Sequence, residues 1–115
     1  ETIGYKSKLF GVTSIGSFAF DHCNLISVTI PNSVTVINDY AFRESGLTSL
    51  TIPNSVNKIS YGAFYGCSLK TIAIPDSVKT IKANAFAYCS LNCIIISDKL
   101  TNRDASAFWD NCIKN

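Results

Sequence analysis

The chain has 115 residues, of which 47% are hydrophobic and 16% are charged, and its formal net charge is +2. A chain of this length and composition can bury the core of a single domain, and the absence of a basic block argues against a nucleic-acid partner. The apolar stretches, such as that from Cys93 to Ile96, are far shorter than the roughly 20 residues that cross a bilayer, so we expect no transmembrane segment here. Because there is no methionine and no secretory signal after Glu1, we expect an excised or processed fragment of a longer protein.

A 22-residue repeat organises the whole sequence. The clearest column, in which an alanine always precedes the repeated residue, consists of Phe20, Phe42, Phe64, Phe86 and Phe108. Columns of leucine, isoleucine, valine and proline follow the same spacing. Such a period predicts a solenoid in which each unit buries its apolar residues against the next. We place about five units within a single domain 1–115, at approximately 3–24, 25–46, 47–68, 69–90 and 91–112.

Each unit is predicted to begin with a short strand. In the third unit, residues 47–52 alternate between apolar and small polar or β-branched positions, a pattern typical of a strand with one buried face. Pro53 has no N–H to donate and ends the strand, and Asn54 and Ser55 form the turn that follows. We expect parallel strands of successive units to stack about 4.8 Å apart.

The rest of the unit is predicted to return across the solenoid. In residues 56–64 the apolar side chains are three to five positions apart and do not alternate. This spacing indicates a short extended or 3₁₀-like return arm that points Val56, Ile59, Ala63 and Phe64 inward. One unit cannot bury these residues alone, so each is expected to pack against its copies in the neighbouring units.

One repeat position, just before the strand leucine, accepts small polar residues. It is occupied by Cys23, Ser45, Cys67, Cys89 and Asn111. Residues of these types suit an inward ladder that forms hydrogen bonds with turn backbone. A disulfide between Cys67 and Cys89 is the competing interpretation, although in-register side chains hold their Cβ atoms farther apart than a disulfide prefers. Cys93, predicted to face solvent, and Cys112, which is out of phase, are the candidates for a reactive or paired thiol.

We find no motif for catalysis or cofactor binding: G-x-G-x-x-G, P-loop, G-x-S-x-G and H-E-x-x-H sequences are absent. The carboxylates are scattered over different repeat positions, which is typical of solvated surface. Cys89 and Cys93 form the only close cysteine pair, and they should face opposite ways, while His22 is the only histidine. The sequence therefore predicts no enzyme, no metal site and no cofactor.

The outward positions of the strands are the predicted ligand-binding surface, expected on the concave side of the solenoid. They are Ser27, Thr29, Thr48, Ser49, Thr51, Lys70, Thr71, Ala73, Asn92, Cys93 and Ile95. This neutral, hydroxyl-rich surface suits hydrogen bonds with an extended peptide or a glycan, although such residues are also simply good exposed strand residues. A second candidate patch, after the return arm, is formed by Tyr40, Tyr61, Tyr65, Tyr88 and Trp109.

The repeat unit resembles a known family. The pattern L-x-x-[VLI]-x-I-P-[ND]-S-V-x-x-I-x-x-x-A-F-x-x-[CS]-x-L, which runs from about Val12 to Ile113, is similar to the BspA-like class of leucine-rich repeats. The resemblance implies a leucine-rich-repeat solenoid with short parallel strands on the concave face and extended or 3₁₀ return arms. Two departures are Lys8, in place of a strand isoleucine, and Arg103, in place of a return-arm isoleucine, which predicts a terminal or degenerate last unit.

The same resemblance carries an expectation about function. Members of this class are cell-surface or secreted proteins, and several adhere to host matrix proteins, host cells or other microbes. It therefore implies a non-catalytic adhesion module, at the cell surface or secreted, whose partner is a protein or glycan of a host cell or matrix. The alternative is a structural spacer or self-assembling unit that associates through the ends of the solenoid.

Overall fold

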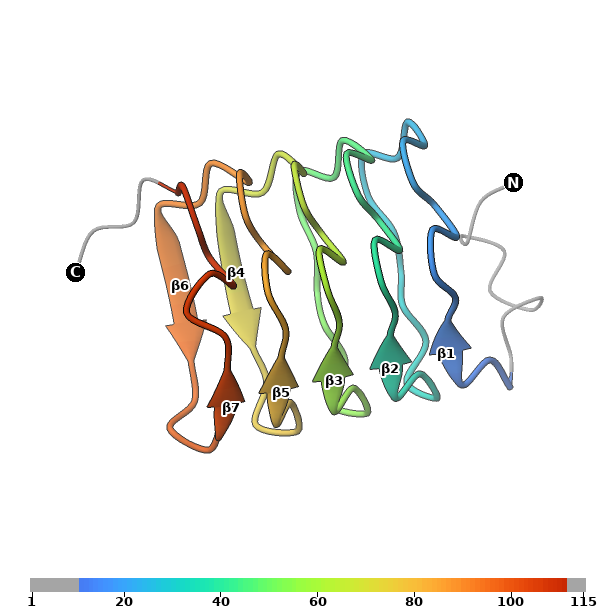
Figure 1. The fold of residues 1–115 in the computed structure, drawn as a ribbon. Coiled ribbons are helices and arrows are strands. Elements are labelled where there is room, and N and C mark those ends of the chain that lie inside the picture. The colour runs from blue at the N-terminus through green and yellow to red at the C-terminus, as the bar shows by residue number, and fades with distance from the viewer. Residues whose placement is uncertain (1–10, 112–115) are drawn as a thin grey trace.

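The structure is a computed structural model that describes residues 11–111. Within that range the chain winds into coils that stack along one axis, with one repeat unit in each coil (Figure 1). Strands and turns make up all of the regular structure between residues 11 and 111, so this part of the chain has no helix that could cross a membrane. The leucine-rich-repeat solenoid expected from the sequence is confirmed.

The return arms form a five-stranded parallel sheet. Its strands, in order, are β1 (Ser14–Ile15), β2 (Val36–Ile37), β3 (Lys58–Ile59), β5 (Thr80–Ile81) and β7 (Asn102–Arg103). Ile37 pairs with Ile59, and Ile59 pairs with Ile81, so the register follows the repeat. The extended form predicted for this arm is confirmed, but its pairing into a sheet was not predicted. Arm backbone groups pair with the adjacent arm because buried N–H and C=O groups need partners.

The strands predicted at the start of each unit form a second parallel sheet, of two strands. These are β4 (Thr71–Ile74) and β6 (Cys93–Ile96), with Thr71 opposite Cys93. The equivalent residues 25–30 and 47–52 are not regular strands, so the expectation of a strand in every unit is wrong for them. There, the hydroxyl of Thr48 approaches the Ile26 carbonyl at 3.5 Å, the same carbonyl that accepts the Thr48 N–H at 3.0 Å. These residues are therefore still joined to the next coil by a backbone hydrogen bond, although they do not form a regular ladder.

The interior consists of the columns that the repeat predicts. The fully buried side chains include those of Phe42, Phe64 and Phe86, and the rings of successive phenylalanines stack with centroids 5.1–5.2 Å apart. Phe20 and Phe108, at the two ends of this stack, are half-buried. The other fully buried members are Val34, Ile37, Leu47, Val56, Ile59, Leu69, Val78, Ile81 and Leu91.

The last described coil departs from the others. Arg103 in β7 is exposed, whereas isoleucines at the same position in β2, β3 and β5 are buried. This agrees with the expectation that the last unit is irregular. The predictions that concern Lys8, Cys112 and Ile113 lie outside the described residues.

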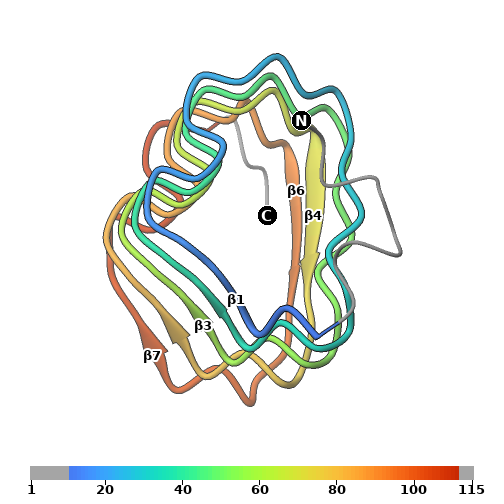
Figure 2. The same cartoon turned by 90° about the vertical axis from the view of Figure 1, so that its right-hand side faces the viewer.

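A zigzag of turns, which we call the turn ladder, closes each coil after the return-arm strand. It comprises residues 16–23, 38–45, 60–67, 82–89 and 104–111, and Figure 2 shows its coils superimposed along the axis. Its N–H groups alternate between two kinds of partner. Ala41 donates to the Asn38 carbonyl of its own coil at 3.2 Å, in the 3₁₀ manner, whereas Phe42 donates to the Ala63 carbonyl of the next coil at 2.7 Å. The 3₁₀-like character predicted from the sequence is therefore found here.

This alternation requires a left-handed backbone conformation at two positions in most coils. The first row of such residues is Phe18, Tyr40, Gly62 and Asn84, and the second row is His22, Glu44, Gly66, Tyr88 and Asp110. A non-glycine residue in this conformation costs on the order of 1 kcal/mol. Hydrogen bonds offset this cost, because most of these residues donate their N–H groups to the next coil, as Tyr40 and Glu44 do at 2.8 and 2.7 Å.

Candidate functional site

All eleven residues of the predicted ligand-binding surface are exposed, and we call this surface the strand face. Thr71 lies opposite Cys93 and Ala73 lies opposite Ile95, so the rows expected from the repeat are formed between the last two coils. The surface becomes apolar in its last coil, where Ile95 is 64% exposed. The strand face is therefore exposed at all eleven positions, and strand pairing holds its last two coils in register.

The polar groups of the strand face are available to a ligand. The hydroxyls of Ser49, Thr51 and Thr71 form no hydrogen bond with another residue between 11 and 111. Lys70 is its single basic residue. The face can thus donate and accept hydrogen bonds, but it provides little long-range electrostatic attraction.

The predicted aromatic patch lies on the turn ladder. Tyr61, Tyr88 and Trp109 are 46%, 46% and 59% exposed, and Phe18, which was not predicted to belong to this patch, is 51% exposed. Phe18 stacks on Tyr40 with ring centroids 5.3 Å apart, and Tyr65 lies 5.2 Å from Tyr88 at a tilt of 54°. Two pairs of these side chains therefore contact each other across coils, and the whole set forms a second candidate surface.

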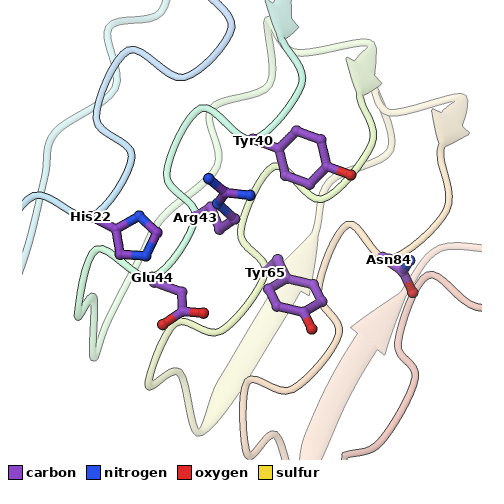
Figure 3. A pocket seen from close by; sticks show the side chains of 6 residues that line it. All are labelled: His22, Tyr40, Arg43, Glu44, Tyr65 and Asn84. Atoms are coloured by element: carbon purple, nitrogen blue, oxygen red, sulfur yellow. The ribbon is translucent and has the colours of Figure 1, made fainter.

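A pocket of about 460 Å³ opens on the turn ladder. Its lining residues are His22, Tyr40, Arg43, Glu44, Tyr65 and Asn84. In Figure 3 the rings of Tyr40 and Tyr65 flank the space, with Arg43 and Glu44 at one end and Asn84 at the other. Of this set, only the two tyrosines were predicted from the sequence to belong to a candidate surface, and His22 was considered there only as a possible metal ligand. The other four occupy variable repeat positions, and the one available signal was the pair of glycines, at 62 and 66, in a single coil.

An ion pair fixes one wall of this pocket. The Nε and Nη2 atoms of Arg43 donate to the two carboxylate oxygens of Asp21, each at 2.8 Å, and His22 Nδ1 lies 2.9 Å from Asp21 Oδ1. The hydrogen bond from Arg43, with a smaller contribution from His22, holds the pKa of Asp21 below its ordinary value. The Arg43 guanidinium also lies 5.0 Å from the centre of the Tyr40 ring and 5.4 Å from that of Phe18.

The inward position predicted for the small polar residues is confirmed. Cys67 Sγ donates to the Phe42 carbonyl at 3.1 Å, Cys89 Sγ donates to the Phe64 carbonyl at 3.0 Å, and Asn111 Nδ2 donates to the Phe86 carbonyl at 2.9 Å. Cys67 and Cys89 are both free thiols, so the competing disulfide between them is not formed. Burial raises the pKa of the Cys89 thiol to about 12 and also raises that of Cys67.

Cys93 is an exposed free thiol, so it faces away from Cys89 as the sequence predicted. Among the described residues, no three or more histidine, cysteine, aspartate or glutamate side chains come together in a way that could hold a metal ion.

Comparisons with known proteins agree with this geometry. The model of the BspA type Leucine rich repeat region matches residues 11–115 in 6 copies. A leucine-rich repeat protein from Bacteroides ovatus ATCC 8483 has a similar structure, with a TM-score of 0.70 and 38% sequence identity, over 73% of this chain and 23% of its own. A leucine-rich repeat protein from Eubacterium ventriosum ATCC 27560 is also similar, with a TM-score of 0.59 and 30% identity, over 77% of this chain and 30% of its own.

The chain thus spans 23% and 30% of the length of these two proteins. No match was found among curated proteins.

Proposed function

Because the chain belongs to the BspA-type leucine-rich repeat family, a family of repeat-protein binding modules that are typically non-enzymatic, we propose that it is a non-catalytic adhesion module of a cell-surface or secreted protein. Its partner is a protein of a host cell, a host matrix or another microbe. The strand face binds that partner. The proposal follows from the family together with the exposed rows of this face.

One observation carries the assignment to the strand face: its exposed hydroxyl-bearing and small side chains lie on successive coils in the register of the repeat. An extended surface of this kind suits a protein partner, since small molecules bind in enclosed clefts and the pocket described above is lined by other residues. The hydroxyls of Ser49, Thr51 and Thr71, which have no partner among the described residues, supply the donors and acceptors that an interface needs at its polar positions.

The test is binding of the purified chain to a panel of immobilised extracellular-matrix proteins, measured by surface plasmon resonance. A variant with Thr29→Glu, Thr51→Glu and Ala73→Glu places three carboxylates on neighbouring coils of the strand face. We expect saturable binding by the wild type to at least one matrix protein and loss of that binding in the variant. The desolvation of unpaired carboxylates at an interface disfavours association.

A matched control carries the same added charge on another side of the solenoid. Thr35→Glu, Asn57→Glu and Thr101→Glu lie at exposed positions of the return arms, away from the strand face, and this variant should bind like the wild type. Equal binding by both triple variants would contradict the assignment to the strand face. Failure of the wild type to bind, together with concentration-dependent self-association in light scattering, would favour the alternative of a self-assembling structural unit.

A further inference from the structure

The turn-ladder pocket exists because one coil lacks two side chains. In both left-handed rows the third coil has glycine, Gly62 in the first and Gly66 in the second, where the neighbouring coils have larger residues. A Cβ atom at Gly62 would lie 2.4 Å from Cε1 of Tyr40, and one at Gly66 would lie 2.8 Å from Cγ of Glu44. The two glycines therefore let the side chains of Tyr40 and Glu44 lie down against the third coil.

The walls of the pocket are held in place before any ligand arrives. Tyr40 lies between the stacked ring of Phe18 and the bare backbone at Gly62, with the guanidinium of Arg43 beside its ring. Arg43 is held in turn by its two hydrogen bonds to Asp21. Side chains that are already ordered lose little conformational entropy on binding, which favours the affinity of a small ligand.

The lining offers two kinds of contact at once. Tyr40 and Tyr65 supply aromatic surface, while Glu44 accepts hydrogen bonds and Asn84 both donates and accepts them. Such a lining matches a ligand that has an apolar C–H face and a rim of hydroxyls. The volume of about 460 Å³ falls within the usual range for small-ligand sites.

The charges of the pocket argue against an anion. The guanidinium of Arg43 is already paired with the carboxylate of Asp21 at 2.8 Å. Glu44 forms no ion pair with any residue between 11 and 111, so its carboxylate repels a phosphate or sulfate and remains free to accept hydrogen bonds from hydroxyls. A neutral polyhydroxylated ligand needs no free guanidinium, and the carboxylate of Glu44 does not repel it.

We propose that this pocket binds one sugar ring of a neutral glycan, with the ring lying against Tyr40 and Tyr65 and its hydroxyls bonded to Glu44 and Asn84. The site is separate from the strand face and does not depend on the protein partner proposed for that face. A module with both sites contacts a protein through one side and a glycan through another.

The experiment uses methyl glycosides of glucose, galactose, mannose, fucose and N-acetylglucosamine as probes, with saturation-transfer NMR and calorimetry on the whole chain. We expect at least one of them to bind with a Kd on the order of 1 mM, as fits a ligand of this size. Tyr65→Ala should weaken that binding roughly tenfold, because it removes one aromatic wall. The matched control is Tyr61→Ala, since Tyr61 is on the same ladder but outside the pocket, and it should leave the Kd unchanged.

A second variant displaces a wall of the pocket without deleting its side chain. Gly62→Asn follows the precedent of Asn84, which occupies the same row with a φ of 61°. Its side chain must displace the ring of Tyr40, so we expect sugar binding to be lost while the circular dichroism spectrum stays that of the wild type. If Gly62→Asn does not fold, Glu44→Gln replaces it, with an expected loss of affinity and an unchanged fold.

Three results would overturn the proposal. The first is that no glycoside binds the wild type at concentrations up to about 50 mM. The second is that binding persists in Tyr65→Ala and in the second variant. The third is that a cationic probe, N-acetyl-lysine methylamide, binds the pocket more tightly than every glycoside, which would assign the pocket to a basic side chain. The triple-glutamate variant of the strand face should keep its sugar binding, so the two proposals fail independently.

Discussion

The strand face and the turn ladder repeat with the same 22-residue spacing, yet they expose different kinds of side chain. The rows of the strand face consist largely of small residues, as in Ser27, Ser49 and Thr71. The first left-handed row of the turn ladder has a phenylalanine, a tyrosine, a glycine and an asparagine. Stacking therefore fixes the backbone and the interior in both regions. The outward side chains are similar from coil to coil on the strand face but differ on the turn ladder.

The difference follows from how each backbone is held. On the strand face a side chain stands beside its copy in the next coil, so neighbouring side chains constrain one another. On the turn ladder the hydrogen bonds to the next coil hold the backbone conformation whatever the outward side chain is, as the similar φ values of 59°, 56° and 57° at Phe18, Tyr40 and Gly62 indicate. A region with this freedom can acquire a pocket in a single coil without disturbing the others.

The largest expected effect concerns the phenylalanine stack beneath the turn ladder. Phe64 is fully buried between two other rings, so Phe64→Ala should lower the free energy of unfolding by about 3–5 kcal/mol. Phe108→Ala is the comparison, because Phe108 is only half-buried and has one stacked neighbour in the described part of the chain. Urea unfolding curves of the two variants measure the difference, and equal losses would show that the ladder does not depend on its central rings.

The second-largest expected effect is a difference in thiol reactivity between the two regions. Cys93 is exposed on the strand face, whereas Cys89 is buried under the turn ladder with its pKa raised to about 12. The thiolate is the reactive form, so Cys93 should react with iodoacetamide at least about a hundredfold faster than Cys89 in the native chain. Mass spectrometry of peptides from a time course gives both rates. Similar rates would mean that the turn ladder opens readily.

Substitution by glycine should change the stability of the fold in opposite directions in the two regions. At Glu44, where φ is 50°, Glu44→Gly relieves the cost of a left-handed conformation and should stabilise the chain by about 0.5–1 kcal/mol. At the exposed residue Thr51, Thr51→Gly should destabilise it by about 0.5–1 kcal/mol, because glycine loses more backbone entropy in an extended segment. Thermal unfolding of both variants measures the signs, and a loss at both positions would contradict this account of the ladder.

The smallest expected effect is the response of the turn ladder to acid. The hydrogen bond from Arg43 holds the pKa of Asp21 below 3.8 in the folded chain. Such a carboxylate stabilises the fold above the unfolded-state pKa, and this contribution is lost as the pH falls through the lower folded-state value. The melting temperature of Asp21→Asn should therefore fall less than that of the wild type between about pH 5 and about pH 2. Parallel curves would show that the ion pair does not contribute.

The sequence predicts the interior well because burial repeats with the period. Phe64, Ile59 and Cys67 are all buried as their repeat positions predict, since each is enclosed by the equivalent residues of the neighbouring coils. The outward rows of the strand face follow from the same alternation. For these residues the contacts repeat with the same 22-residue period as the side chains, so the sequence alone predicts which residues are buried.

The backbone conformation of the turn ladder cannot be predicted from the residue types at its positions. Phe18 and Tyr40 adopt the same left-handed conformation as Gly62, although aromatic residues give no local signal for it, because hydrogen bonds to the next coil impose it. The sequence does not predict the pocket for a related reason. It depends on residues of several coils that approach one another only after stacking, such as Tyr40 and Gly62.

The register of the coils also affects how the number of repeats can change during evolution. Ile37 pairs with Ile59 and Ile59 with Ile81, so each junction between coils resembles the next. Duplication or deletion of a 22-residue segment rejoins equivalent junctions and changes the length by one coil, whereas an indel of another length shifts every later column out of alignment. Unequal recombination within the gene can therefore vary the distance between two surface features while each coil keeps its own structure.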